Sequence, residues 1–121
     1  MKKILLVEDD PFLTDIYSSK FKEAGFSIEV VGDGEATLRK IEEKKPDLIM
    51  LDLVLPHVDG WEILKKIKED PKFNKIPVVL FSNLGQRGDI EKGMAMGAVK
   101  YLIKAQYTPS EVVSEIKKIL K

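Results

Sequence analysis

Five short apolar runs, separated by longer amphipathic segments, constrain the fold of this chain more than any other feature. The runs cover residues 4–7, 28–31, 48–51, 78–81 and 99–103 and are rich in branched side chains. Their apolar residues are nearly continuous rather than alternating, which is typical of strands buried on both faces of a sheet. We therefore expect five strands in a sheet that is covered on both sides.

The segments between these runs have the spacing and the end residues of helices. They cover residues 10–25, 33–45, 59–67, 86–96 and 108–119. The first and the last begin with a capping side chain followed by proline, Asp10-Pro11 and Thr108-Pro109. Strict alternation of strands and helices predicts an α/β fold, a doubly wound parallel sheet of the (βα)5 type.

Two of the expected helices carry details that the structure can test. In the first, we expect Phe12, Ile16 and Phe21 to share a face, and Gly25 to end the helix. The fourth, over residues 86–96, is the weakest prediction, because Gly88 and Gly93 each lower helix stability.

Length and composition narrow the class of protein. A chain of 121 residues suits one domain, which we place over residues 1–121. Twenty basic and twenty acidic residues cancel, so no positive excess indicates direct binding of nucleic acid. The apolar run after Lys2-Lys3 is too short for a signal peptide, and no stretch approaches the ~20 apolar residues of a membrane span. We expect a soluble cytoplasmic domain without disulfides, since cysteine is absent.

Charged and polar residues follow the strands at their carboxyl ends. Glu8 and Asp9 follow the first run, Asp52 interrupts the apolar stretch LIMLDLVLP, Ser82 follows the fourth run, and Lys104 follows the fifth. Ligands of open α/β sheets bind at this edge, where the strand order reverses. If the strands take the order 2-1-3-4-5, the strands that end in Glu8-Asp9, Asp52 and Lys104 flank this point, and the ends of the strands form a candidate site.

The chemistry of this group indicates phosphoryl transfer. Two like charges about 4 Å apart repel by roughly 4 kcal/mol at an effective dielectric constant of 20, so three carboxylates need cations beside them. Lys104 supplies one cation, and Mg²⁺ suits a site with few carboxylates and several waters. A metal ion and an ammonium group also neutralise a transferring phosphoryl group, and an Asp carboxylate can attack phosphorus.

Four motifs carry a resemblance to a known family. They are ILLVEDD, LDLVLPHVDG, VVLFSN and YLIK, and Ser82 and Lys104 follow Asp52 by 30 and 52 residues. Along nearly its whole length the chain resembles the receiver domain of two-component response regulators. The resemblance implies a flavodoxin-like sheet of order 2-1-3-4-5 and a signalling domain. Such a domain is no enzyme on external substrates and catalyses only its own phosphorylation and dephosphorylation.

The resemblance also implies a role for each site residue. Asp52 would be the phosphoacceptor, and Mg²⁺ would be bound by Asp9, by Asp52, by Glu8 through water and by the backbone carbonyl of Val54. We interpret Asp10, the residue after the acidic pair, as a helix cap.

The remaining positions would act on the phosphoryl group or transmit the signal. Ser82 would hydrogen-bond the phosphoryl group, Lys104 would pair with its oxygens, and the Tyr101 ring would turn inward when Ser82 moves. The donor would be a sensor histidine kinase or a phosphotransfer protein. The fourth helix, fifth strand and fifth helix would present the changed face to a downstream protein partner, with the chain a monomer or a weak dimer when phosphorylated.

The sequence departs from the family pattern at two positions. The family usually has proline after the lysine, often in a cis bond, whereas Ala105 follows here, and a cis bond before alanine costs about 3 kcal/mol more than a trans bond. The family also favours a small residue after the Ser/Thr, and Asn83 is larger.

Two other functions compete with the phosphorylated switch. A phosphohydrolase of the haloacid dehalogenase type would carry a second Asp two residues after its nucleophile, where this chain has Val54. A degenerate receiver would bind partners without phosphorylation, but all five key positions are filled. His57, the single histidine, is interpreted as a loop residue and not as a phosphodonor.

Overall fold

A computed structural model describes residues 1–120 and contains the expected alternation of strands and helices. The elements, in chain order, are β1 (Lys3–Val7), α1 (Pro11–Glu23), β2 (Ser27–Val31), α2 (Gly34–Lys44), β3 (Leu48–Leu51), α3 (Gly60–Glu69), β4 (Val78–Ser82), α4 (Arg87–Ala95), β5 (Lys100–Ile103), the 3₁₀ turn η1 (Lys104–Gln106) and α5 (Pro109–Ile119).

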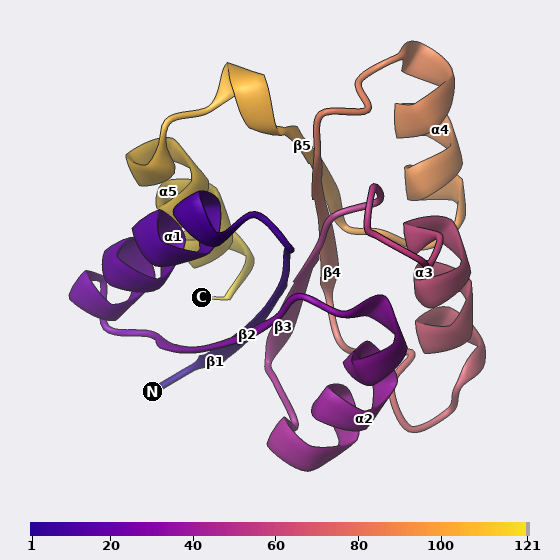
Figure 1. Cartoon of the computed structure of the whole chain (residues 1–121), viewed down its shortest axis with the longest axis horizontal. Coiled ribbons are helices and arrows are strands. Elements are labelled where there is room, and N and C mark those ends of the chain that lie inside the picture. The colour runs from indigo at the N-terminus through magenta and orange to yellow at the C-terminus, as the bar shows by residue number, and fades with distance from the viewer. Residues whose placement is uncertain (121) are drawn as a thin grey trace.

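The strands form one parallel sheet with the order β2-β1-β3-β4-β5. Helices α1 and α5 cover one face, and α2, α3 and α4 cover the other (Figure 1). The fold class and the strand order expected from the sequence are therefore confirmed. Among the described residues, no helix has both the length and the apolar character needed to cross a membrane.

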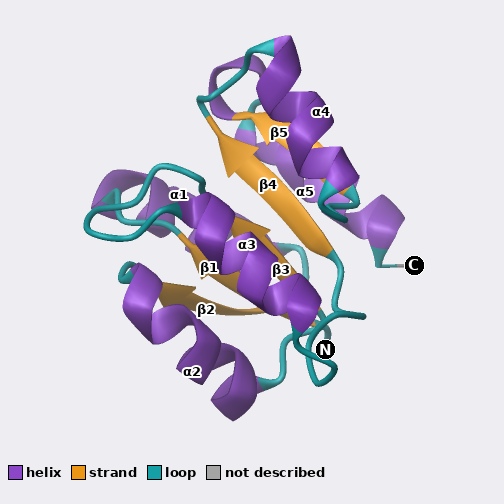
Figure 2. Ribbon diagram, turned by 90° about the vertical axis from the view of Figure 1, so that its right-hand side faces the viewer, coloured by secondary structure: helices purple, strands orange, loops and turns teal. Residues whose placement is uncertain are grey.

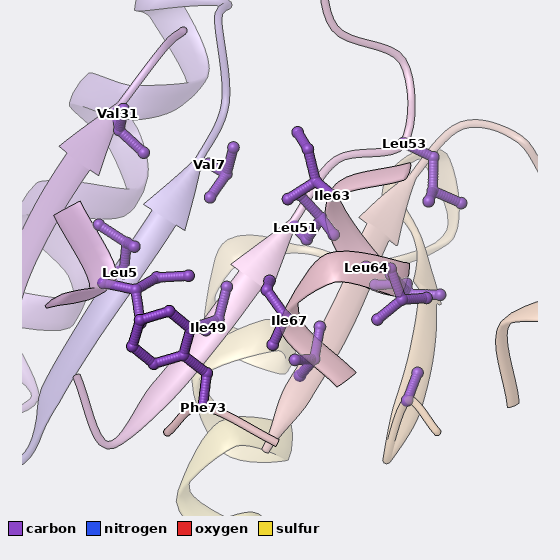
Figure 3. Packing of buried hydrophobic residues seen from close by; sticks show 14 residues of the cluster. Leu5, Val7, Val31, Ile49, Leu51, Leu53, Ile63, Leu64, Ile67 and Phe73 are labelled. Carbon is purple, nitrogen blue, oxygen red and sulfur yellow. The ribbon is translucent and has the colours of Figure 1, made fainter. Parts of the chain in front are cut away.

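Each face of the sheet packs a separate hydrophobic core. In β1, Leu5 and Val7 belong to the core under α2, α3 and α4, whereas Ile4 and Leu6 belong to the core under α1 and α5. The sequence shows a continuous apolar run because both sets of alternating side chains are buried. Figure 3 shows the first core, in which Ile63, Leu64 and Ile67 of α3 face the strands.

Side-chain caps explain where several helices begin. The carboxylate of Asp10 accepts a hydrogen bond from Phe12 N at 2.9 Å, and Thr108 and Glu111 form a capping box at the start of α5. Gly25 follows α1 with φ of 93°, a left-handed conformation that favours glycine. These ends agree with the sequence prediction.

One prediction about α1 is wrong. Phe12 is 72% exposed and does not share a face with Phe21, which is fully buried. A helix turns about 100° per residue, so nine residues place these two side chains on opposite sides. Tyr17, one turn before Phe21, lies in the core in its place. A smaller correction concerns the fifth strand, which begins at Lys100 instead of Val99.

Candidate functional site

The predicted site residues meet at one edge of the sheet. The strands are parallel and their arrowheads point to a common side (Figure 2). Glu8 and Asp9 directly follow β1, Asp52 directly follows β3, Ser82 is the last residue of β4, and Lys104 directly follows β5. An open pocket of about 440 Å³ lies here, and it is lined by Glu8, Asp9, Asp10, Asp52, Val54, Asn83, Leu84 and Lys104.

Three carboxylates are clustered in this pocket. Glu8, Asp9 and Asp52 each offer an oxygen, and these oxygens lie within 4.8 Å of one another. Glu8 and Asp52 are only 2% and 5% exposed, whereas Asp9 is exposed to solvent. Buried carboxylates lose hydration and require cations or hydrogen-bond donors in place of water.

Lys104 is the cation that the buried carboxylates contact. Its Nζ donates to Asp52 Oδ2 at 2.7 Å and also pairs with Glu8 Oε1. Burial acts to lower the pKa of Lys104, but the hydrogen bonds to Asp52 and Glu8 outweigh it and raise the pKa above its usual value. For Glu8, burial raises the pKa more than Lys104 lowers it.

Hydrogen bonds from a backbone N–H and from the Lys104 side chain fix the orientation of the Asp52 carboxylate. Its Oδ1 accepts a hydrogen bond from Val54 N at 3.0 Å, and its other oxygen is held by Lys104. Asp52 N donates to Val7 O at 3.1 Å, which ties the end of β3 to β1. The carboxylate is therefore held from both sides and directed into the pocket.

Gly60 is a site residue that sequence reasoning missed. The helix expected over residues 59–67 does begin here, and Asp59 caps α3 by accepting from Trp61 N at 2.9 Å. However, a Cβ at position 60 would lie 2.5 Å from Leu53 Cα and 2.7 Å from Asp52 O. Only glycine allows the start of α3 to pack against the backbone of Asp52. A glycine at the first position of a helix was the available signal.

Ser82 and Tyr101 meet at the loop between β4 and α4. Ser82 is fully buried, and its Oγ accepts from Leu84 N at 3.3 Å. The Tyr101 hydroxyl donates to the carbonyl of Leu84. Burial raises the pKa of Tyr101 to about 12, with the negative charges of Asp89 and Asp52 contributing. Both side chains are therefore tied to the same loop residue.

The two departures from the family pattern contact each other. The Lys104–Ala105 peptide is trans, since residues 1–120 contain no cis peptide bond. Ala105 N donates to Asn83 Oδ1 at 3.1 Å. Asn83 lies on the rim of the pocket, and Lys104 still reaches Asp52 without proline after it.

The donor set fits a hard divalent cation. Carboxylate oxygens from Glu8, Asp9 and Asp52 converge, and the single nearby ammonium group leaves an excess of negative charge. Mg²⁺ prefers oxygen ligands and binds through one or two carboxylates while it keeps several waters. The exposure of Asp9 leaves a side of the cluster open to such waters.

Comparison with known proteins decides the family. The sequence model of the response regulator receiver domain matches residues 4–117. The chain belongs to the response regulator receiver domain family. The part of the chain that matches contains every site residue named above.

Curated relatives of this receiver domain include DNA-binding and transcriptional regulators. This chain is 34% identical to the DNA-binding dual master transcriptional regulator RpaA of Synechocystis sp. The match covers the whole of this chain and 50% of RpaA. The chain is 32% identical to the alkaline phosphatase synthesis transcriptional regulatory protein PhoP of Bacillus subtilis, over 99% of this chain and 49% of that one. The chain thus spans about half the length of these relatives.

Solved receiver domains have the same fold. The BeF3-activated N-terminal receiver domain of Klebsiella pneumoniae RstA matches with a TM-score of 0.88 and 26% identity, over 97% of each chain. The Mn(2+)-bound form of response regulator Rcp1 matches with a TM-score of 0.83 and 27% identity, over 98% of this chain and 91% of that one.

In this receiver domain, the structure brings the predicted site residues together. Glu8, Asp52 and Lys104 form one ion-pair cluster, with Asp9 beside it. Ser82 and Tyr101 join the same region through Leu84. His57 lies in the exposed loop between β3 and α3, outside the lining of the pocket, as interpreted from the sequence.

Proposed function

We propose that this receiver domain is a phosphorylation-dependent signalling switch whose phosphoacceptor is Asp52. The donor is the phosphohistidine of a sensor histidine kinase or of a phosphotransfer protein, and the reaction depends on Mg²⁺. The single observation that carries the proposal is the state of Asp52. It is a nearly buried carboxylate, held by Lys104 and Val54 N, at the edge of an open acidic pocket.

The reaction requires one bond to form and one to break. An oxygen of Asp52 attacks phosphorus, the phosphorus–nitrogen bond to the donor histidine breaks, and the electron pair returns to the imidazole nitrogen. Bound Mg²⁺ would neutralise oxygens of the phosphoryl group and of Asp52. The protein groups that would hold this ion are the side chains of Glu8, Asp9 and Asp52 and the backbone carbonyl of Val54.

Lys104 and Ser82 stabilise the product in this proposal. The Lys104 ammonium, which pairs with Asp52 before the reaction, pairs with a phosphoryl oxygen after it. The Ser82 hydroxyl accepts a hydrogen bond from Leu84 N and can also donate one. Donation to the phosphoryl group would draw Ser82, and the loop attached to it, toward Asp52.

Movement of that loop would carry the signal to α4, β5 and α5. The contact that supports this route is the hydrogen bond from the Tyr101 hydroxyl to Leu84, because the loop cannot move without affecting this ring. Amide chemical shifts, compared with and without beryllofluoride as a phosphoryl mimic, test the route. We expect shifts across α4, β5 and α5, and shifts confined to the loops around Asp52 would contradict it.

The primary experiment is intact mass after incubation with acetyl phosphate and Mg²⁺. We expect one phosphoryl group per chain, stable in acid and labile in base, and none when Mg²⁺ is chelated. Asp52→Asn should take up none. Stoichiometric labelling of Asp52→Asn would move the phosphoacceptor to another residue, and no labelling of the wild-type protein would favour a degenerate receiver. Steady release of phosphate from an external substrate would favour a phosphohydrolase.

Partners follow from the same proposal. The downstream target is a protein, and we expect no direct binding of nucleic acid, because a formal net charge of zero offers no positive excess for it. The domain acts in the cytoplasm, as a monomer or as a weak dimer when phosphorylated. DNA binding named for relatives such as RpaA would then lie outside the half of those proteins that this chain matches.

A further inference from the structure

The hydrogen bond between Asn83 and Ala105 joins the two loops that carry the groups facing the phosphoryl site. Asn83 directly follows Ser82, and Ala105 directly follows Lys104. Asn83 Oδ1 accepts from Ala105 N at 3.1 Å. The contact therefore connects the position of the Ser82 hydroxyl to the position of the Lys104 ammonium.

The register of the sheet explains why a side chain is needed here. Ser82 and Ile103 form the last paired positions of β4 and β5. Beyond them the chain turns into η1 on one side and into the loop before α4 on the other. The Asn83 side-chain amide carries the same carbonyl group as a peptide and continues the β4–β5 ladder by one further bond.

Lys104 depends on this loop for its placement. Its ammonium group must reach Asp52 and Glu8 at the same time, and its backbone lies at the start of a turn of only three residues, Lys104–Gln106. A proline at position 105 would offer no N–H to Asn83. Alanine does offer one, so Asn83 and Ala105 act as a pair.

From these contacts we infer that Asn83 is a positioning residue for the phosphorylation reaction, which acts by holding the Lys104 loop against the end of β4. This inference rests on the proposed function of Asp52. It also gives a role to the larger side chain at position 83, which lies on the rim of the pocket and bonds to the residue after Lys104.

The test compares four proteins for the rate of phosphorylation by acetyl phosphate at saturating Mg²⁺. They are the wild type, Asn83→Ala, Lys104→Ala and the double variant. Asn83→Ala should react about threefold more slowly, which is the lower end of what one net hydrogen bond contributes. It should have no further effect when Lys104 is already alanine, because Asn83 acts through Lys104. A merely structural role would slow both backgrounds equally.

A matched control and a direct readout accompany the rates. Asn74→Ala changes an exposed asparagine of another loop and should leave the rate unchanged. Hydrogen exchange of the Ala105 amide, measured without any phosphodonor, should accelerate in Asn83→Ala and not in Asn74→Ala.

The possible failures are distinguishable. A wild-type protein that takes up no phosphoryl group would remove both the proposed function and the inference. A labelled wild type whose rate and Ala105 exchange equal those of Asn83→Ala would overturn the inference alone. A threefold loss that persists in the Lys104→Ala background would also overturn it.

Discussion

At the scale of single residues, the cost of burying charge explains how the site is built. Asp52 is almost fully buried at the end of an apolar strand, and it is tolerated there because Lys104 and Val54 N replace the lost hydration. Glu8 is in the same situation and shares the same lysine. Asp9 alone of the three acids is exposed, which makes it the most accessible ligand for a hydrated cation.

The adjacent acids Asp9 and Asp10 should therefore differ in metal binding. Asp10 already accepts hydrogen bonds from Phe12 N and Leu13 N as the cap of α1, whereas Asp9 belongs to the carboxylate cluster. We expect Asp9→Ala to weaken Mg²⁺ binding strongly. Asp10→Ala should bind Mg²⁺ nearly as well but lose about 1 kcal/mol of stability with its cap. Calorimetric titration and urea unfolding measure the two effects, and equal losses of affinity would show that the wrong acidic pair was chosen.

The lifetime of the phosphoryl group should depend on two apolar side chains in the pocket. Hydrolysis needs a water placed in line with the phosphoryl group, and a polar side chain can orient it. Val54, which is 58% exposed, and Leu84 both line the pocket and offer no side-chain hydrogen bond to such a water. We therefore expect slow self-dephosphorylation for a receiver domain.

The double change Val54→Asn with Leu84→Glu should speed this hydrolysis. An acceleration of about tenfold corresponds to roughly 1.4 kcal/mol of barrier. The measurement is the decay of labelled protein in excess Mg²⁺ without donor. Val54→Asn alone serves as a second variant, since Leu84 also packs against the core. An unchanged or slower decay in both variants would mean that access of water is limited elsewhere, with Asn83 the first residue to examine.

At the scale of elements, α4 is held differently from the other helices. Gly93 is the one buried residue of α4. A Cβ at this position would lie 2.5 Å from Leu80 Cδ1 and 3.2 Å from Tyr101 Cδ2. The glycine that lowers helix stability thus allows the helix to approach the sheet and the Tyr101 ring. Helix α4 also contacts α3, because Lys92 Nζ lies 4.3 Å from the ring centroid of Trp61. Few side chains therefore fix the helix that is proposed to move.

The two glycines of α4 should respond in opposite directions to alanine. Gly93→Ala should destabilise the protein by about 1–3 kcal/mol, because the added methyl group overpacks the contact with Leu80 and Tyr101. Gly88→Ala is the control, since a Cβ there meets nothing within 4 Å, and it should stabilise the helix by about 0.5–1 kcal/mol. Urea unfolding gives both values, and Trp61 emission reports displacement of Lys92. Equal effects of the two substitutions would contradict the close packing of α4.

At the scale of the whole molecule, buried Tyr17 and half-buried Tyr101 link stability to alkaline pH. Burial raises the pKa of Tyr17 and of Tyr101 from 10.0 to about 12, one on each face of the sheet. In the unfolded chain these tyrosines ionise near pH 10, while in the folded protein they stay protonated. Their contribution is therefore complete below about pH 10 and is lost as the pH rises toward 12.

Unfolding free energies between pH 9 and 11.5 test this linkage. Each tyrosine should add a downward slope approaching about 1.4 kcal/mol per pH unit above pH 10. Tyr17→Phe and Tyr101→Phe should each make the slope shallower, whatever they do to the stability at pH 7. A slope that is unchanged in both variants would show that lysines, and not these phenols, dominate alkaline unfolding.

The sequence by itself determined the fold class and which residues reach the site. Near-continuous apolar runs require a sheet covered on both faces, and in a parallel sheet the residues that follow the strands lie at one edge. This reasoning brought Glu8, Asp52 and Lys104 together, and the structure confirms that they meet. Their roles in phosphoryl transfer stay predictions. Local capping signals also placed the start of α5 correctly.

Only the tertiary structure decided the contacts between segments that are distant in sequence. The close approach at Gly60 and at Gly93 depends on which backbone or ring lies opposite each glycine. The presence of glycine in the sequence does not reveal which group that is. Helix spacing alone separates Phe12 from Phe21, but how α1 rests on the sheet decides that the side with Tyr17 and Phe21 is the buried one. The bond between Asn83 and Ala105 joins residues 22 positions apart, and it exists because β4 and β5 are neighbours that end side by side.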